Sequence, residues 1–182
     1  MNELQILAGC KEQKREAQKM LYDKYARKMY SICLRYCSDA DSAQDLLQDG
    51  FMKVFANISS FQEKGSFEGW LKRIFINLAL ENLRKKKNVI QTSDDVQNIP
   101  DVVDDSTEDE EMYKISEDEL LKMIQELPQG YATVFNLYAI EDYSHKEIAE
   151  LLGINESTSR SQYVRARQLL QAKVKQYIKE RS

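Results

Sequence analysis

The sequence contains few of the residues that interrupt helices or cross-link small domains. Two prolines and six glycines in 182 residues leave long uninterrupted stretches, and no segment shows the β-branched alternation expected of strands. The three cysteines are odd in number and form no Cys-x-x-Cys pair, which argues against a disulfide framework and for a reducing compartment. These scarcities predict an all-α protein of the cytoplasm.

Sequence features of membrane proteins and enzymes are also missing. No apolar run approaches the roughly 20 residues of a spanning helix, and the opening stretch MNELQILAGCKEQK is unlike a signal peptide. The single histidine, His145, is not part of a metal-ligand spacing, and the sequence has neither a glycine-rich phosphate loop nor a Ser/His/Asp set. We therefore expect a protein that is not an enzyme, with no metal and no other cofactor.

The net charge of −4 hides an uneven distribution. Residues 1–87 carry 16 Lys and Arg against 11 Asp and Glu, residues 88–120 carry 1 against 12, and residues 121–182 carry 9 against 7. Two mildly basic blocks therefore flank one acidic stretch. Such asymmetry is typical of chains that bind a polyanion through part of their length.

Composition divides the chain into three expected parts. Helical domains are expected over residues 1–87 and 116–182, joined by an acidic flexible linker over residues 88–115. The linker shows no helical period and has nine carboxylates and one proline between residues 88 and 112. A segment of this kind cannot bury a core of its own.

Apolar periodicity predicts three long helices in the first domain, over residues 12–37, 40–57 and 67–87, with a loop over 57–66. At helical spacing, Trp70 and Phe75 are more typical of core residues than of platforms for stacking bases.

The second domain is expected to begin with a short helix at 116–126 and a helix that follows Pro128. An S-x-x-E capping box at Ser144 then opens a short helix that ends at Gly153. Asn155 is expected to cap a final helix that runs to about residue 179. A short capped helix, a glycine turn and a longer helix form the pattern of a helix-turn-helix, whose second helix enters the DNA major groove.

Two faces of this final helix differ in chemistry. Ser159, Tyr163, Ala166 and Leu170 recur at the spacing of a packed side. The other side concentrates short hydroxyls, a valine and arginines, which can reach base edges and phosphates. Surface helices of similar composition also occur without any partner, so this pattern alone leaves DNA binding as one of two interpretations.

The motifs of both domains, taken in order, resemble the extracytoplasmic-function (ECF) group of bacterial RNA polymerase sigma factors. The first domain carries DLLQDGFMKVF at 45–55, FQEKGSFEGWL at 61–71, Arg73-Ile74, Asn77-Leu78-Ala79 and Leu83-Arg84-Lys85. The second carries Leu127-Pro128, Val134-Phe135, YSHKEIAELLGI at 143–154, Thr158, Ser161 and Arg165-Ala166-Arg167.

Three positions depart from the family pattern. Gly50 lies in mid-helix where the family usually has an apolar or β-branched residue. Ser159 replaces a common inward valine, and Gln162 replaces a common arginine. The first departure costs helix propensity, about 1 kcal/mol relative to alanine.

The resemblance implies a sigma region 2-like helical bundle and a sigma region 4-like helix-turn-helix. It implies a factor that binds core RNA polymerase, recognises two promoter elements and assists DNA melting. The implied partners are promoter DNA, the clamp of the largest polymerase subunit, the flap of the second-largest subunit and an anti-sigma factor. The alternative is a helix-turn-helix regulator that acts on duplex DNA alone, with a sensing or dimerisation domain at its N-terminus.

The family motifs also imply three sets of contact residues. The polymerase contacts would be Asp45, Gln48 and Asp49, whose spacing places them on one helix face. Spacing alone slightly favours a solvated acidic surface, and the resemblance reverses that preference. The contacts to the start-proximal (minus ten) element would be Gln62, Glu63, Lys64, Gly65, Ser66, Lys72, Arg73, Asn77, Arg84 and Lys85. The contacts to the upstream (minus thirty-five) element would be Ser157, Thr158, Arg160, Ser161, Val164, Arg165 and Arg167.

Overall fold

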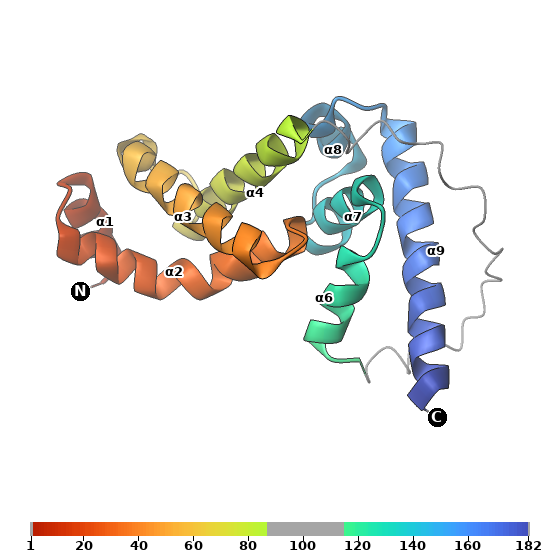
Figure 1. The fold of residues 1–182 in the computed structure, drawn as a ribbon. Coiled ribbons are helices and arrows are strands. Elements are labelled where there is room, and N and C mark those ends of the chain that lie inside the picture. Colours follow the sequence, from red (N-terminus) through yellow and green to blue (C-terminus); the bar gives the residue numbers. More distant parts are fainter. Residues whose placement is uncertain (1, 87–114, 182) are drawn as a thin grey trace. The chain divides into compact units, whose positions relative to one another are not determined.

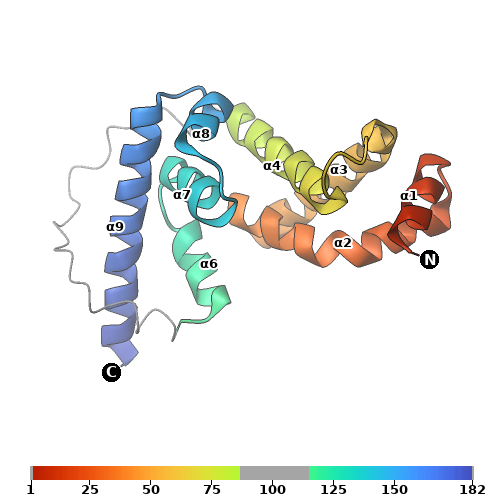
Figure 2. The ribbon, with the colours of Figure 1, turned by 180° about the vertical axis from the view of Figure 1, so that it is seen from behind.

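The computed structural model describes residues 2–86 and 115–181, and their regular structure is entirely helical (Figures 1 and 2). The chain divides into two compact units, Met1–Lys85 and Lys86–Ser182. The predicted all-α fold with two helical domains is therefore confirmed. The linker expected over 88–115 lies, apart from Ile115, outside the described residues.

The N-terminal unit is built from four described α-helices and one short 3-10 turn. They are α1 (Glu3–Lys11), α2 (Arg15–Tyr36), α3 (Ala40–Asn57), η1 (Ile58–Ser60) and α4 (Phe67–Lys85). Helix α2 packs against α1, α3 and α4, and α3 packs against α4. The predicted boundaries of α3 and of the start of α4 agree with the structure.

Helix α1 was not predicted from the sequence. It is nine residues long, too short to display several helical periods. Its start is fixed by a capping box: Asn2 Oδ1 accepts from the Gln5 amide at 2.9 Å, and Gln5 Oε1 accepts from the Asn2 amide at 2.9 Å. Leu7 and Cys10 are buried, so α1 is held in place by packing, although its sequence is too short to show an apolar period.

Gly50 of α3 lies directly against the ring of Phe75 on α4. A Cβ atom added there would lie 2.1 Å from Cε1 of Phe75, far inside the normal carbon–carbon contact of about 3.5–4.0 Å. Phe75 is fully buried, and its ring meets Phe51 edge-on with centroids 5.4 Å apart. The family departure at this position thus has a packing reason, because the ring of Phe75 occupies the space of the missing side chain.

The C-terminal unit contains α6 (Glu117–Gln125), α7 (Gln129–Phe135), the π-helical turn η2 (Asn136–Ile140), α8 (His145–Leu152) and α9 (Glu156–Arg181). Its core cluster consists of Met123, Ile124, Leu127, Tyr131, Ala132, Ala166, Leu170 and Val174. Helix α9 packs against α6, α7 and α8, as Figures 1 and 2 show.

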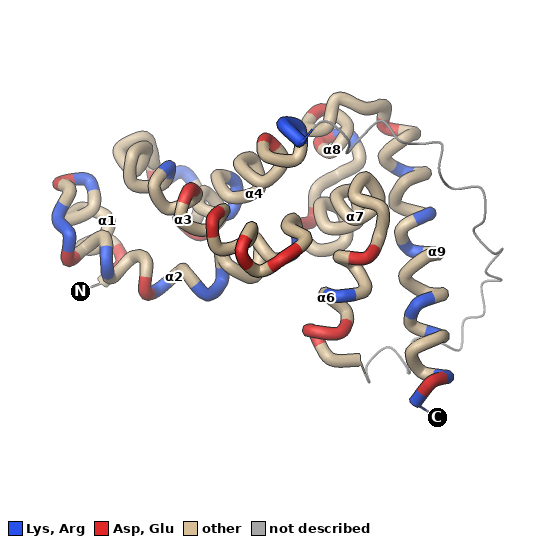
Figure 3. Tube along the Cα trace, viewed as in Figure 1, with Lys and Arg blue, Asp and Glu red and all other residues tan. Residues whose placement is uncertain are grey.

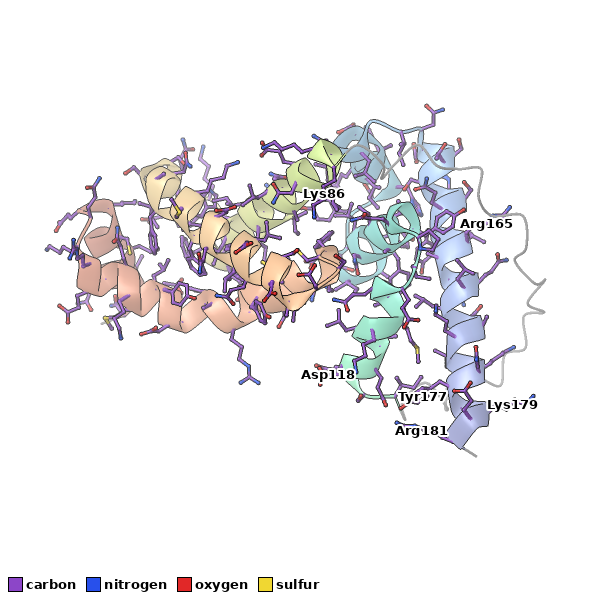
Figure 4. All side chains as sticks on the ribbon, viewed as in Figure 1. Lys86, Asp118, Arg165, Tyr177, Lys179 and Arg181 are labelled. Atoms are coloured by element: carbon purple, nitrogen blue, oxygen red, sulfur yellow. The ribbon has the colours of Figure 1, made fainter. Side chains whose placement is uncertain are left out.

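The last turns of α9 are tied to the start of α6 (Figure 4). Glu119 accepts a hydrogen bond from the Tyr177 hydroxyl and pairs with Arg181 at 2.9 Å, while the Arg181 guanidinium lies 4.4 Å from the Tyr177 ring centroid. The hydrogen bond from Tyr177 holds the pKa of Glu119 below its ordinary value. These contacts attach the last turns of the long helix to α6.

Candidate functional sites

The exposed face of α3 is acidic and polar, with one apolar side chain at its end. The helix begins at Asp39, whose Oδ1 accepts from the Ser42 amide at 2.7 Å. Asp45, Gln48 and Asp49 are all exposed on one side, as the resemblance implied. The structure thus brings the three expected polymerase contacts onto one accessible surface.

Met52 was missed by the sequence analysis as part of this face. It follows Asp49 by three residues and Asp45 by seven, and 71% of its surface is exposed. A methionine in an amphipathic helix is usually taken as a core residue, so an exposed position was not expected from its residue type. Met52 therefore adds one exposed apolar side chain to the face that carries Asp45, Gln48 and Asp49.

The loop before α4 presents polar groups between two buried aromatic residues. Phe61 and Phe67 anchor its ends, with ring centroids 5.2 Å apart. Residues 62–66 between them are exposed, and two of them have a positive φ, 58° at Glu63 and 98° at Gly65. Because Phe61 and Phe67 are both buried, the two ends of the loop are fixed, and the residues between them face solvent.

The aromatic residues of this region are mostly core. Phe61, Phe67 and Phe75 are buried. Trp70 is half-buried, and its ring centroid lies 5.5 Å from those of both Phe61 and Phe67. The prediction that aromatic residues here build the core is confirmed for Phe75. Exposed groups of the loop and of α4 are thus better placed to meet DNA than these rings are.

The expected minus-ten residues on α4 are spread along the length of the helix. Arg73 and Asn77 are exposed one turn apart. Lys72 is half-buried, with its ammonium 3.7 Å from Glu68, and Lys85 pairs with Glu81 at 3.2 Å. Arg84 lies at the far end of the helix.

At 1.5 Å per residue, the distance along the axis from Ser66 to Arg84 is about 27 Å. That length suits a nucleic-acid backbone laid along the helix better than a single bound base.

The helix-turn-helix is formed by α8, the turn at Gly153 and α9. Ser144 and Glu147 form the predicted capping box, with Ser144 N–H donating to the Glu147 carboxylate at 2.8 Å and Glu147 N–H to Ser144 Oγ at 3.2 Å. Gly153 has φ 67°, in the left-handed region that favours glycine, and its N–H donates to the Ala149 carbonyl. The predicted cap and stop signals of α8 are both confirmed.

The outer face of α9 carries a shallow groove of about 630 Å³. It is lined by Ser157, Arg160, Ser161, Val164, Arg165 and Gln168. Arg160 pairs with Glu156 at 2.8 Å, and Val164 is 51% exposed. Arg165 has no ion-pair partner within residues 2–86 and 115–181, and Figure 4 labels its side chain on α9.

Three residues of α9 differ from the expected arrangement of this face. Thr158 is half-buried, and Arg167 is exposed but lies outside the groove. Gln168 lines the groove and was missed, although it follows Val164 by four residues and so shares its side of the helix.

Gln162 lies on the packed side of α9, with 8% of its surface exposed. Its departure from the family pattern therefore affects packing, and it contributes nothing to the groove. Figure 3 shows Lys and Arg recurring along the whole of α9, so the groove lies on a cationic helix.

Two further features are absent from the described part of the chain. Within it, no helix combines the length and apolar character needed to cross a bilayer. No group of three or more His, Cys, Asp and Glu side chains gathers there in a way that could hold a metal ion.

Comparison with known proteins agrees with this architecture. Residues 21–89 match the family model described as sigma-70 region 2, and residues 117–170 match that of sigma-70 region 4. The ECF RNA polymerase sigma factor SigW of Bacillus subtilis is 30% identical over 167 residues, which cover 85% of this chain and 87% of SigW. The chain belongs to the ECF sigma factors.

Other ECF sigma factors show similar agreement. SigM of Bacillus subtilis is 28% identical, with 84% of this chain and 91% of SigM covered, and the sigma-E factor of Haemophilus influenzae is 29% identical, with 88% of each covered. The sigma factor RpoE of Bartonella quintana, solved in complex with the anti-sigma factor NepR, has a TM-score of 0.55 at 24% identity, covering 86% of this chain and 96% of RpoE. The predicted function of an ECF sigma factor, promoter-specific initiation with RNA polymerase, is thereby confirmed, and the duplex-only regulator is not favoured.

Proposed function

We propose that this ECF sigma factor divides its work between its two units. The N-terminal unit docks on the clamp of the largest polymerase subunit and captures the opened minus-ten strand, whereas the C-terminal unit contacts the flap of the second-largest subunit and recognises the minus-thirty-five element. The observation that supports this most directly is that α3 in the first unit and α9 in the second each expose a face rich in polar and charged side chains. The faces differ in chemistry, acidic on α3 and hydroxyl- and arginine-rich on α9.

The polymerase contact is assigned to Asp45, Gln48 and Asp49. Two carboxylates one turn apart can pair with arginines on a partner surface, and charge-assisted hydrogen bonds of this type are the stronger ones. Met52 adds an apolar group beside them that loses its hydration on contact.

The minus-ten contacts are assigned to the loop of residues 62–66 and to the exposed groups of α4. Duplex melting requires a site that holds an unpaired base, because extruding a base costs a few kcal/mol. The loop supplies hydrogen-bonding groups for such a base, Asn77 lies on the helix that follows it, and Arg73 and Arg84 attract the strand backbone in a salt-dependent way. Lys72 and Lys85 must exchange their carboxylate partners for phosphate to take part.

The minus-thirty-five contacts are assigned to the groove on α9. An arginine such as Arg165 can make two hydrogen bonds to guanine, and Val164 can contact a thymine methyl group. Glu156 holds Arg160 in the free protein, which orients its guanidinium before DNA arrives.

The same proposal includes the cellular location of the protein and one further partner. The chain acts in the cytoplasm, has no reaction of its own and requires no cofactor, because bond formation belongs to the polymerase. An anti-sigma factor is a further proposed partner, of the class that holds the Bartonella quintana protein in its solved complex.

Replacing Arg165 with alanine tests the upstream assignment. If Arg165 bonds to a base, Arg165→Ala weakens binding of the holoenzyme to its promoter by about 1–3 kcal/mol and relaxes selectivity at one base pair. The measurement is the dissociation constant on promoter fragments with each base substituted in turn.

Arg167→Ala is the matched control, because Arg167 is exposed on the same helix outside the groove. It should weaken binding uniformly or leave it unchanged. Equal weakening by Arg165→Ala on every fragment would show that Arg165 contacts phosphate alone.

A further inference from the structure

The corner between α8 and α9 contains a polar contact that the proposed DNA face does not use. His145 Nδ1 lies 2.9 Å from Ser159 Oγ, and Ser159 is inaccessible to solvent, with 0% of its surface exposed. In the described chain, all the buried polar residues (Thr133, Asn136, Ser159 and Gln162) belong to the C-terminal unit. A buried hydroxyl is costly when its hydrogen bond is not made, so this contact constrains the corner.

In this contact we assign Ser159 as the donor and His145 as the acceptor. Nδ1 is the partner of the Ser159 hydroxyl within the described residues, and a buried hydroxyl proton needs an acceptor. Acceptance at Nδ1 requires a neutral imidazole with its proton on Nε2. The surroundings favour that form, because burial and then the charge of Arg160 lower the pKa of His145, against a smaller opposing effect of Glu156.

Aromatic rings fix the orientation of the same imidazole. The ring of Tyr138, from η2, stacks on it with centroids 4.1 Å apart and an interplanar angle of 10°. Tyr163 of α9 contacts both, with its centroid 4.5 Å from Tyr138 and 6.0 Å from His145. Three elements, η2, α8 and α9, therefore meet at His145.

Fixing Ser159 also fixes the DNA-facing side of α9. An α-helix turns by about 100° per residue, so an inward Ser159 keeps Ser157 and Ser161 outward, in the groove. A valine at this position, as is common in the family, would pack without a directional bond. The hydrogen bond to His145 instead sets both the rotation and the spacing of α9 against α8.

We propose that His145 is a positioning residue for recognition of the upstream promoter element. By bonding to Ser159 and stacking on Tyr138, it holds α9 at the rotation that aligns its groove with base edges. This inference rests on the proposed role of α9 and adds to it the residue pair that sets the geometry. His145 acts through Ser159, with no base contact of its own.

The test uses holoenzyme assembled from core polymerase and the full chain. Dissociation constants are measured on a promoter fragment with an intact upstream element and on the same fragment with that element scrambled. Their ratio is the selectivity. His145→Ala is expected to lower the selectivity about tenfold, the size of one lost base contact, while binding to the scrambled fragment changes less than about twofold.

Two further variants separate the hydrogen bond from general packing. Ser159→Ala should lower the selectivity as His145→Ala does, and the double variant should lose little more, because both remove one shared contact. His145→Asn, which can place a polar atom near the position of Nδ1, should recover most of the selectivity. His145→Phe, which keeps the ring on Tyr138 but loses the acceptor, should not.

The pH dependence supplies a readout that simple packing would not change. The folded chain binds the His145 proton less readily than the unfolded chain, so the stability of the corner falls as pH falls below about 6.5. Arg160 and Glu156 are the charged groups of α9 that act on the ring. Wild-type selectivity should therefore decline with acidification more steeply than that of His145→Asn.

Each outcome bears on the proposal. A wild-type selectivity near one would overturn the proposed role of α9, and this inference with it. A wild-type selectivity that survives in His145→Ala, or equal weakening of both fragments, would overturn this inference alone. Circular dichroism and the thermal midpoint establish that each variant is folded. If His145→Ala unfolds the C-terminal unit, the smaller change Ser159→Ala decides the question by the same ratio.

Discussion

Reversing the charge at Asp45 and Asp49 together is expected to abolish binding to core RNA polymerase. Both carboxylates are exposed on α3, and replacing them with arginines sets like charges against the cationic partner that they are proposed to meet. Like-charge contacts at an interface cost several kcal/mol, so affinity for core should fall by more than about a hundredfold. The measurement is the dissociation constant of the fluorescently labelled chain with core polymerase.

A matched pair of substitutions controls for the change in net charge. Glu12→Arg with Glu16→Arg alters the charge by the same amount, at exposed positions at the C-cap of α1 and in the first turn of α2. This control should bind core as the wild type does. Both double variants should keep their helix content by circular dichroism. Unchanged affinity of the Asp45→Arg, Asp49→Arg chain would remove the docking assignment.

The second large effect is expected at Gly50, where Gly50→Val introduces the residue type common in the family. Its side chain would occupy the space of the Phe75 ring, which is fully buried and held edge-on by Phe51. Overpacking of a core typically costs 1–3 kcal/mol, and occasionally more, while the gain in helix propensity over glycine is less than about 1 kcal/mol. We expect a net loss of about 2 kcal/mol from the N-terminal unit.

Trp70 makes this loss measurable in one unit alone. It is the only tryptophan of the chain and lies on α4, so its fluorescence during urea unfolding reports on the N-terminal unit. Adding Phe75→Leu to Gly50→Val should restore part of the lost stability, because the smaller side chain leaves room for the valine. An unchanged urea midpoint in Gly50→Val would mean that α3 and α4 are not held at this distance.

Much of the fold could be predicted because local signals agreed with the packing. The Ser144 capping box and Gly153 each act within one turn of the backbone, so the sequence revealed both ends of α8 directly. The amphipathic period of α9 likewise revealed which side is packed. Helix α1 escaped prediction because nine residues hold too few periods.

The parts that were not predictable depend on contacts between distant residues. Gly50 appeared to be a simple cost in helix propensity until the structure placed Phe75 against it. Ser159 appeared to be a poor substitute for valine until His145, fourteen residues earlier, provided its hydrogen-bond partner. Met52 has a side chain typical of a core and an exposed position, and only three-dimensional packing distinguishes the two.

Transcription in vitro tests the division of work between the two units most directly. Core polymerase, the purified chain and a library of genomic promoter fragments are combined, and the RNA products are mapped to their start sites. The account predicts discrete start sites that depend on the chain, that disappear with Asp45→Arg and Asp49→Arg, and that require both promoter elements. RNA with no defined start, or the same starts without the chain, would contradict it.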